Sequence, residues 1–253
     1  MELLFLGTGT SHGVPMIGCD CAVCTSADPR DRRTRASVLL SWDGRCVVVD
    51  TTPDFRHQML THGVRRVDAV LYTHHHADHI HGVDDVRVFS TRSRRPLPAY
   101  AGPDTCRFFR QNFRYIFEVN PANLNVPRLD MQAVNGSFEL LGRRIVPVPV
   151  QHGPDVILGY RVDGVAYLPD CNGIPPASRA LLADLDVLVL DALRPEPHPS
   201  HFSLDESLEV ARQLRPRRTW LTGLSHRLGH AATSACLTPG VQVAYDGLRL
   251  HVR

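Results

Sequence analysis

The histidines of this chain are unevenly distributed, and their clustering points to metal chemistry. Five of the 14 fall within eight residues, at positions 74, 75, 76, 79 and 81, directly after the apolar run Val67 to Tyr72. In an extended chain, side chains two positions apart project to the same side, so His74 and His76 converge while His75 points away. Asp78 and His79 follow where we expect a helix to begin. There Asp78 can cap the helix, and both side chains can reach a second ion.

Together, His74, His76, Asp78 and His79 offer nitrogen and oxygen ligands within six residues. Such a mixed set suits one or two borderline divalent ions such as Zn²⁺ or Mn²⁺. The competing interpretation is a polar surface loop that happens to be rich in histidine. A loop of that kind would not require this spacing after a buried strand, so the sequence favours a metal site.

A second group of potential ligands comes from the cysteines. The chain has seven, an odd number, and Cys19, Cys21 and Cys24 lie within six residues. This pattern fits a reduced compartment and a thiolate metal site better than a disulfide framework. Alternatively, the three thiols are incidental buried cysteines. The remaining four, Cys46, Cys106, Cys171 and Cys236, are isolated and are expected to have no special chemistry.

Composition excludes several functional classes. The chain has 253 residues, 43% of them apolar and 21% charged, which is typical of a folded globular protein. The net charge of +2 is too small to predict nucleic-acid or membrane binding from the overall field. The sequence contains no lysine, so Schiff-base chemistry is excluded and any cationic contact to an anion must come from arginine or histidine.

Neither a signal peptide nor a membrane span is apparent in the sequence. The start of the chain lacks a basic region and has only four apolar residues, Leu3 to Leu6, before a glycine-rich stretch. No run approaches the roughly 18 apolar residues that a membrane span needs. We therefore expect a cytoplasmic protein with no membrane partner.

Strand-length apolar runs recur throughout the chain and outnumber the helical segments. The expected strands are 3–6, 37–41, 46–50, 67–72, 145–150, 158–162, 165–168, 187–190, 219–221, 241–245 and 248–252. The last two flank Asp246 and Gly247, a dipeptide that predicts a terminal hairpin. The expected helices are 53–62, 176–184 and 204–214, the last capped by Ser203 with Glu206.

This order of elements predicts an α+β fold in which two sheets pack face to face with helices outside. The least patterned region, Ser90 to Pro127, suggests an insertion over the site.

The motif His-x-His-x-Asp-His resembles the signature of the metallo-β-lactamase superfamily, and the resemblance extends over nearly the whole chain. It implies a single domain, residues 1–253, with an αββα sandwich of two mixed sheets and metals at one edge. It also implies His152 as an isolated ligand after a strand and Asp170 as a carboxylate bridging two metals. Taken alone, His152 would be a loop histidine and Asp170 a turn residue, but their order after the first four ligands favours the metal roles.

Within that superfamily, the opening Gly7-Thr-Gly-Thr-Ser-His-Gly-Val-Pro15 followed by the three cysteines resembles the phosphoribosyl 1,2-cyclic phosphate phosphodiesterase group, relatives of ribonuclease Z. The resemblance implies a structural Zn²⁺ held by Cys19, Cys21, Cys24 and His226. A Cys₃His shell has no open position, so this ion would hold the chain together and do no chemistry.

The same resemblance implies a metal-dependent hydrolase, specifically a phosphodiesterase acting on a small or cyclic phosphodiester. Two divalent ions about 3.5 to 4 Å apart can hold a hydroxide for in-line attack on phosphorus. We expect Asp78 and His201 in catalytic roles, His201 as general acid or phosphate contact. His12 is a weaker candidate, and the loop glycines near it could offer backbone N–H groups to an anion. The arginine clusters 30–35 and 92–95 are expected to be solvated surface.

Two alternatives remain open: a thioester or lactam hydrolase of the same fold, and a metal-stabilised module with impaired catalysis. The second arises at Gly223, where the phosphodiesterase group would be expected to carry a histidine ligand of the second metal. The space left by the missing side chain at Gly223 should admit water or a substrate group. Alternatively, His230 could supply the missing ligand, or the second site could bind its ion only weakly. The expected partner is a small phosphodiester rather than a specific nucleic acid sequence, and a homodimer is possible.

Overall fold

Two seven-stranded sheets form the centre of the molecule. The computed structural model describes residues 1–118 and 126–252. In spatial order, the first sheet contains β14 (Arg249–His251), β1 (Glu2–Gly7), β2 (Ser37–Trp42), β3 (Arg45–Val49), β4 (Ala69–Leu71), β5 (Leu97–Ala101) and β6 (Leu129–Ala133). The second contains β13 (Val241–Val243), β12 (Arg218–Thr222), β11 (Val187–Asp191), β10 (Val165–Leu168), β9 (Asp155–Val162), β8 (Arg143–His152) and β7 (Phe138–Leu140). Each sheet mixes parallel and antiparallel pairs, as expected from the sequence.

Both sheets are buried on two faces, which explains why their central strands are apolar throughout. In β1, Leu3 and Phe5 point into the core between the sheets, while Leu4 and Leu6 point to the outer face. β11 repeats this pattern in the second sheet, with Val187 inside and Leu188 outside. Because successive side chains alternate, a strand covered on both faces must be apolar throughout.

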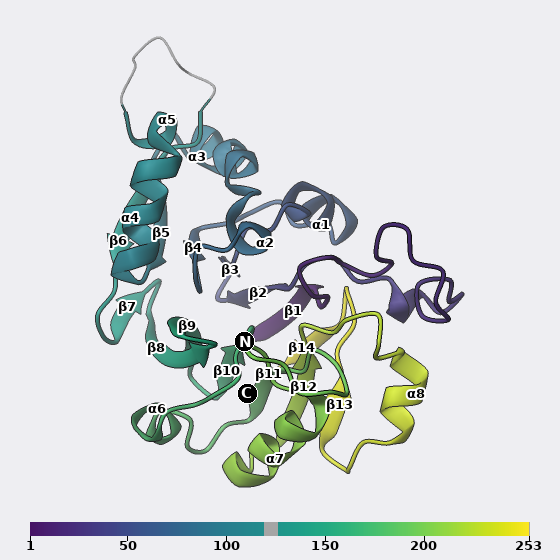
Figure 1. Cartoon of the computed structure of the whole chain (residues 1–253). Helices are drawn as coiled ribbons and strands as arrows, with labels where there is room; N and C mark the ends of the chain where they lie inside the picture. The colour runs from purple at the N-terminus through teal and green to yellow at the C-terminus, as the bar shows by residue number, and fades with distance from the viewer. Residues whose placement is uncertain (119–125, 253) are drawn as a thin grey trace.

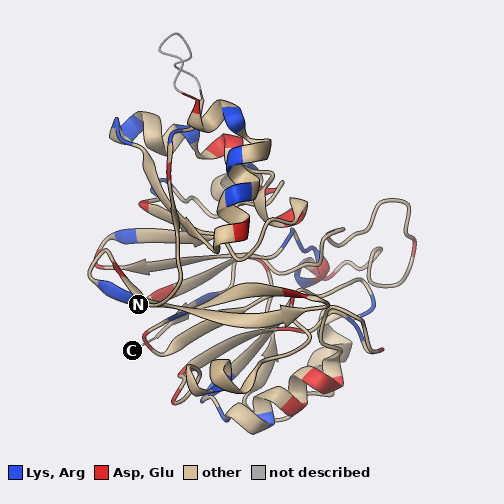
Figure 2. Ribbon diagram, turned by 60° about the vertical axis from the view of Figure 1, so that its left-hand side comes forward, with Lys and Arg blue, Asp and Glu red and all other residues tan. Residues whose placement is uncertain are grey.

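Helices cover the outer faces and complete an αββα sandwich (Figure 1). Over the first sheet lie α1 (Phe55–Thr61), α2 (Ala77–Ile80), α3 (Arg87–Ser93), α4 (Pro103–Asn112) and α5 (Arg114–Phe117), with the 3₁₀ turns η1 (Pro29–Asp31) and η2 (Val83–Val86) in the connections. On the side of the second sheet lie α6 (Pro176–Ala180), α7 (Leu204–Leu214) and α8 (His230–Ala235). Figure 2 shows charged residues on the helices and loop ends, with largely uncharged sheets between them.

The helix α7 begins as its sequence predicts. The Ser203 side chain accepts a hydrogen bond from the backbone N–H of Glu206, and the Glu206 carboxylate accepts one from the N–H of Ser203. This capping box satisfies two backbone donors that a helix start would otherwise leave free.

The predicted terminal hairpin is wrong. β13 pairs with β12 in the second sheet, whereas β14 pairs with β1 in the first, so Asp246 and Gly247 carry the chain from one sheet to the other. The Asp246 carboxylate accepts hydrogen bonds from the Thr8 hydroxyl and from the N–H and hydroxyl of Thr34. These contacts to the first sheet's loops outweigh the local turn preference of the dipeptide.

The region Ser90 to Pro127 is part of the sandwich rather than an insertion, apart from residues 119–125, which lie outside the described residues. It contains β5, α4 and α5, and Ala99, Phe109 and Ile116 all pack in the outer core of the first sheet. Its aromatic residues are therefore core, and the start of α4 also reaches the site described below.

The parallel pairs place the chain's chemistry at one edge. β3 and β4 run parallel, as do β10, β11 and β12, so their carboxyl ends meet at the same side of the sandwich. Asp50, His74, Asp170, Asp191 and Gly223 all lie at or just after these ends. Among the described helices, none combines the length and the apolar character needed to cross a membrane.

Candidate metal centre

Six of the predicted site residues meet at this edge. Ligand atoms of His74, His76 and His152 lie within 4.8 Å of one another, and so do those of His74, His79 and Asp170. A third group, His152, Asp170 and His201, satisfies the same limit. The three groups share members, so side chains from α2, from the end of β8 and from the loops after β4, after β10 and before α7 form one continuous cluster.

The buried carboxylate of Asp50 positions two of these histidines. It accepts hydrogen bonds from the Thr73 N–H at 2.8 Å, from the Thr73 hydroxyl at 2.8 Å and from His79 Nδ1 at 2.7 Å. Thr73 Oγ1 in turn lies 2.9 Å from His74 Nδ1 and accepts its proton. Each ring thus donates through Nδ1, which leaves Nε2 to face the cluster.

A backbone carbonyl positions the third histidine. His152 Nδ1 lies 2.8 Å from the carbonyl oxygen of Ser200 and donates to it, so His152 Nε2 is also free to bind an ion. The ring of His75 instead stacks on Phe108, with centroids 4.6 Å apart, and points away from the ligands as the strand geometry predicts. His76, not Asp78, is the N-cap residue of α2, so the predicted capping role of Asp78 is wrong.

Three carboxylates, those of Asp50, Asp78 and Asp170, lie against the ring of His79. Its Nε2 lies 3.0 Å from Asp170 Oδ2 and 3.5 Å from Asp78 Oδ2. Burial lowers the pKa of His79, but the carboxylates of Asp170 and Asp50 outweigh it and raise this pKa well above the usual value. Burial conversely raises the pKa of Asp170, and the charge of His79 overcomes this effect and lowers it well below the usual range. The carboxylates therefore favour the protonated, positively charged form of His79. A metal ion that binds to this ring must displace its proton.

These residues fit divalent ions. His74 Nε2 is buried and has no hydrogen-bond partner among the described residues, although it faces the rings of His76 and His79 at 4.5 and 4.2 Å between centroids. A buried polar atom without a partner is costly, and a metal ion would satisfy it. The imidazole and carboxylate donors suit Zn²⁺ or Mn²⁺.

His201 stands beside the cluster in a second buried pair. Its Nδ1 donates to Asp191 Oδ2 at 2.8 Å, and its ring centroid lies 4.9 Å from that of His152. Burial raises the pKa of Asp191 to about 6. Burial also lowers the pKa of His201, but the Asp191 carboxylate more than offsets this and raises it to about 9. His201 therefore carries a proton at neutral pH.

The three clustered cysteines and His226 come together as expected. His226 Nδ1 lies 3.2 Å from Cys19 Sγ and 3.4 Å from Cys21 Sγ, and Cys24 completes the group. The Cys24 N–H donates to Cys21 Sγ and lowers the pKa of this thiol to about 6, while burial raises the pKa of Cys24 to about 11. Four converging donors of this type fit a tetrahedral Zn²⁺ site.

A buried arginine, Arg33, also connects the N-terminal loop region to the segment that contains His226. Arg33 donates to the carbonyl oxygens of Ser225 at 3.2 Å and Leu228 at 2.7 Å, and pairs with Asp31 at 3.1 Å. Asp31 also accepts a hydrogen bond from the N–H of His230. The expectation that this arginine cluster is entirely solvated is therefore wrong for Arg33, although Arg30 and Arg32 are exposed.

Gly223 does not leave an open space. A Cβ atom at this position would lie 2.2 Å from Asp191 Oδ1, and the backbone φ of +71° is unfavourable for any other residue. The carboxylate of Asp191 occupies the volume that we expected to admit water or substrate. The expectation that His230 could swing in is not supported, because its N–H is tied to Asp31 and its ring packs 5.7 Å from Tyr245.

The glycine-rich first loop is used for packing. The N–H of Gly9 donates to the Thr34 carbonyl and that of Gly13 to the Thr10 carbonyl, each at 2.8 Å. These groups are not free to bind an anion, which contradicts the role considered for them. A Cβ on Gly7 would lie 2.0 Å from the Arg35 carbonyl oxygen, so close backbone approach explains this glycine.

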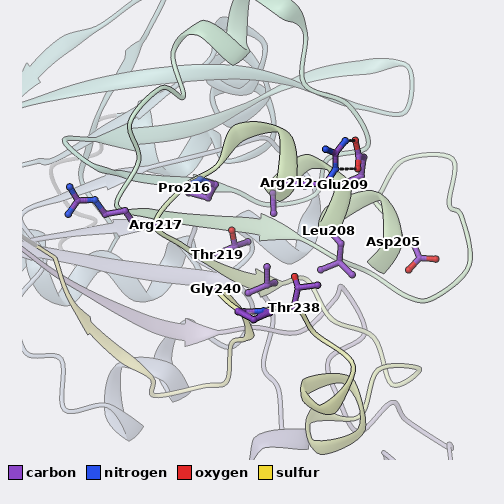
Figure 3. Close-up of a pocket in the computed structure, with 12 residues that line it drawn as sticks. Asp205, Leu208, Glu209, Arg212, Pro216, Arg217, Thr219, Thr238 and Gly240 are labelled. Carbon is purple, nitrogen blue, oxygen red and sulfur yellow. Dashed lines mark hydrogen bonds and ion pairs between the residues drawn. The ribbon is translucent and has the colours of Figure 1, made fainter.

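Two pockets border the cluster, one lined by His201 and the other by His74, His76 and His152. One, the Arg194 pocket, has a volume of about 280 Å³ and is lined by His12, Arg194, His198, His201, His226 and Arg227 among others. The other, the Val156 pocket, has a volume of about 370 Å³, and its lining includes His76, Asp104, Val134, His152, Asp155 and Val156. A third hollow, of about 520 Å³, lies between α7 and β13; Figure 3 shows that it contains the Glu209–Arg212 ion pair, and none of the candidate ligands line it.

Sequence reasoning missed the residues that orient the ligands. Asp50 and Asp191 each end an apolar run, as Asp170 nearly does, and both are fully buried. A carboxylate at the end of a buried strand was thus a detectable signal, although nothing in the sequence tells which of the three faces an ion and which holds a histidine.

The first prediction concerns the thiolate group. Cys21→Ser should remove one equivalent of bound zinc and lower the melting temperature by more than about 5 °C, because a chain of this size loses roughly 2–4 °C per kcal/mol. Metal analysis and calorimetry measure both effects. The control is Cys236→Ser at an exposed, isolated cysteine, which should change neither. Unchanged zinc content in Cys21→Ser would contradict the assignment.

The second prediction uses two glycines with the same backbone angle. Gly44 and Gly223 both have φ +71°, but a Cβ on Gly44 meets nothing within 4 Å. Gly44→Ala should cost only the left-handed strain of about 1–2 kcal/mol. Gly223→Ala should cost about 1–3 kcal/mol more, because the methyl overlaps Asp191. Urea unfolding measures the difference; equal losses would show that Asp191 moves freely.

The comparisons with known proteins agree with this geometry. Residues 45–223 match the family described as "Beta-lactamase superfamily domain". A solved structure described as a new diphosphatase from the PhnP family is 47% identical, with a TM-score of 0.92, and the match covers 98% of this chain and 96% of that one. Zn²⁺-bound PqqB from Methylobacterium extorquens shares the fold at 21% identity, with a TM-score of 0.80 over the full length of both chains.

A curated relative differs in length. An octanoyltransferase of Porphyromonas gingivalis is 35% identical over 253 residues, which cover 98% of this chain and 51% of that protein. The chain thus spans about half the length of that relative. Given the family match, the sandwich and the metal-ligand cluster at its edge, the chain belongs to the metallo-β-lactamase superfamily and is similar to its PhnP-like group.

Proposed function

We propose that this metallo-β-lactamase-fold hydrolase is a metal-dependent phosphodiesterase acting on a small or cyclic phosphodiester, of the phosphoribosyl or nucleoside cyclic phosphate type. The observation that carries the proposal is the pair of His201 and Asp191, whose 2.8 Å hydrogen bond holds the His201 ring beside the ligand cluster. The 47% identical structure described as a diphosphatase supports phosphorus chemistry. The volumes of the two flanking pockets, about 280 and 370 Å³, suit a small molecule.

His201 is suited to phosphodiester cleavage. Because Asp191 holds its Nδ1 and raises its pKa to about 9, the ring carries positive charge at neutral pH next to Asp170 and His152. An alkoxide leaving group is a strong base and needs a proton, which His201 Nε2 can donate. A thiolate leaves without one, so this arrangement favours a phosphodiester over a thioester.

The ligand residues divide the remaining work. His74, His76 and His152 would hold one divalent ion, and Asp78, His79 and Asp170 would hold a second, with Asp170 shared between them. Bound ions of this kind neutralise phosphate oxygens and lower the pKa of water. Asp50 and Ser200 fix the rings so that the nitrogen facing the site carries no proton when an ion binds.

One observation favours an acyl substrate instead: the 35% identical relative is named as an octanoyltransferase. This chain covers only half of that protein, so the name does not locate the activity in the shared half. We therefore keep thioester hydrolysis as the second candidate and include it in the test.

The test compares three substrates on one preparation. Metal-free protein is reconstituted with Zn²⁺ or Mn²⁺ and assayed with adenosine 2′,3′-cyclic phosphate, an octanoyl thioester and a cephalosporin. We expect hydrolysis of the phosphodiester at a kcat/KM at least about 100-fold above either alternative, because its alkoxide leaving group can use the His201 proton. Selective hydrolysis of the thioester would instead establish the second candidate.

Two substitutions separate metal binding from proton donation. Asp170→Ala should lower active-site metal content and abolish turnover, because it removes a carboxylate shared by both ligand sets.

His201→Asn should retain metal and lower turnover on an alkyl phosphodiester by about 10²–10⁴-fold. In the parent, turnover should decline as pH rises through the His201 pKa, since the acid must be protonated, and His201→Asn should lose this decline. Metal loss in His201→Asn would make His201 a ligand instead.

A further inference from the structure

The two pockets beside the ligand cluster differ in their apolar walls. Each is lined by four histidines, so imidazole groups do not distinguish them. Among the residues that line the Arg194 pocket, only Met16 and Leu193 are large and apolar. The Val156 pocket has six apolar lining residues: Pro103, Val134, Pro149, Val156, Ile157 and Leu158. An uncharged ring is therefore favoured in the Val156 pocket, because more apolar surface is removed from water there.

The Val156 pocket adjoins the candidate ligands. Three of its histidines, His74, His76 and His152, also belong to the ligand cluster. A phosphate group bound by that cluster therefore has the organic part of the substrate next to this space. The volume of about 370 Å³ lies within the range of small-molecule sites.

The fourth histidine of this pocket, His75, offers a flat surface. Its ring stacks on that of Phe108, with an interplanar angle of 24° and 4.6 Å between centroids. Phe108 thus covers one face of the His75 ring and fixes its plane, so the pocket meets the opposite face or the edge. Nucleobases stack on aromatic side chains held in this way, because every base has a π-face.

Val156 is an apolar side chain that the protein itself does not cover. It lies in β9, and 68% of the residue is exposed, against 5% for its neighbour Ile157. A ring bound in the pocket would cover Val156 and bury apolar surface on both partners. Because Val156 lies outside the core, its substitution tests binding without disturbing the fold.

Two carboxylates supply the polar side of the pocket, those of Asp104 and Asp155. Asp104 is already engaged in an ion pair with Arg107. Asp155 pairs with the ligand residue His152 across the β8–β9 hairpin, and its carboxylate has no ion pair or hydrogen bond among the described residues. An ionised carboxylate only accepts hydrogen bonds, so it favours an amino group over a carbonyl oxygen at the same place.

We propose that the Val156 pocket is a nucleobase subsite, in which the base lies against His75 and Val156 and donates from an exocyclic amino group to Asp155. The inference rests on the proposed phosphodiesterase function and deepens it. Of the two substrate types named for that function, it selects the nucleoside cyclic phosphates. Among these it selects the compounds whose base carries an amino group, such as adenine.

The first test removes the base and keeps the reacting ring. Metal-loaded protein is assayed with adenosine 2′,3′-cyclic phosphate and with the 2,3-cyclic phosphate of methyl β-ribofuranoside, in which a methoxy group replaces the base. In the parent, kcat/KM should be at least about ten-fold higher for the adenosine compound, the effect of one stacked base. Val156→Arg, whose long side chain fills the pocket and can pair with Asp155, should abolish this preference.

The control is Val88→Arg, the same substitution at another exposed valine. Val88 is 44% exposed and lines a hollow between α1 and α3 that none of the candidate ligands line. This variant should change neither the ratio nor the rate. Active-site metal content and melting temperature are measured for every variant, because Val156 follows Asp155, the residue opposite His152.

The second test concerns the Asp155 carboxylate. Inosine 2′,3′-cyclic phosphate carries a carbonyl oxygen where the adenosine compound carries the amino group. The parent should prefer the adenosine compound by about ten-fold or more, the effect of one hydrogen bond to a charged group. Asp155→Asn offers both a donor and an acceptor and should remove this preference. Asp184→Asn, at an exposed aspartate that lines neither pocket, should keep it.

The outcomes separate the subsite from the proposed function. If the parent hydrolyses the adenosine and methyl riboside compounds equally well, or Val156→Arg keeps the preference, the nucleobase subsite is wrong while the phosphodiesterase function stands. If the parent does not distinguish adenosine from inosine, or Asp155→Asn still does, the role of Asp155 is wrong.

If none of these compounds is hydrolysed at any metal concentration, the proposed function is in error, and calorimetric binding to the metal-loaded protein still decides the subsite. The parent should bind adenosine 3′-monophosphate at least about ten-fold more tightly than the 3-phosphate of methyl β-ribofuranoside. Val156→Arg should remove this difference. Equal binding of the two compounds by the parent would overturn the subsite.

Discussion

The buried carboxylate of Asp50 is the interaction on which the metal centre depends. It connects the end of β3 to two ligand histidines: through Thr73 it orients His74, and directly it orients His79. Burial raises the pKa of Asp50, so keeping it charged costs free energy, which its three donors offset. The residue also adopts φ +67°, a strained angle for an aspartate. Because Nδ1 of each ring is held in this way, directly or through Thr73, Nε2 remains free. Only a free ring nitrogen can bind an ion.

Asp191 and His201 form a second pair in which a buried carboxylate orients a histidine. This pair also explains why residue 223 is a glycine. Asp191 has two oxygens: Oδ2 accepts from His201 and from the Cys171 N–H, while Oδ1 has no partner among the described residues and faces Gly223. Any larger residue at 223 would displace the carboxylate and with it His201. The absence of a side chain here therefore preserves the hydrogen bond between His201 and Asp191. It also means that the second ion, where bound, relies on Asp78, His79 and Asp170.

The sequence predicted the sandwich and most of the cluster for physical reasons that can be identified. Apolar runs buried on both faces, such as Leu3 to Leu6, can only be central strands, and His74 and His76 converge because strand side chains alternate. Three features were not predictable. The 241–252 segment contains a strong local turn signal, yet long-range hydrogen bonds from Thr8 and Thr34 to Asp246 divide it between two sheets. The buried side of α4 consists of only Thr105, Cys106 and Phe109, too short a stripe to indicate a helix in the sequence, and the role of Asp50 appears only once β3 and β4 lie side by side.

The thiolate site is remote from the ligand cluster in sequence but not in its consequences. His226 belongs to the Cys₃His group through Nδ1 and also lines the Arg194 pocket, together with Met16, whose N–H donates to Cys24 Sγ. An ion bound by the cysteines would therefore fix one wall of that pocket. Arg33 and Asp31 hold the same two segments by a buried network that needs no metal. A closed thiolate site, which has no open position for chemistry, would thus still shape a pocket beside the ligand cluster.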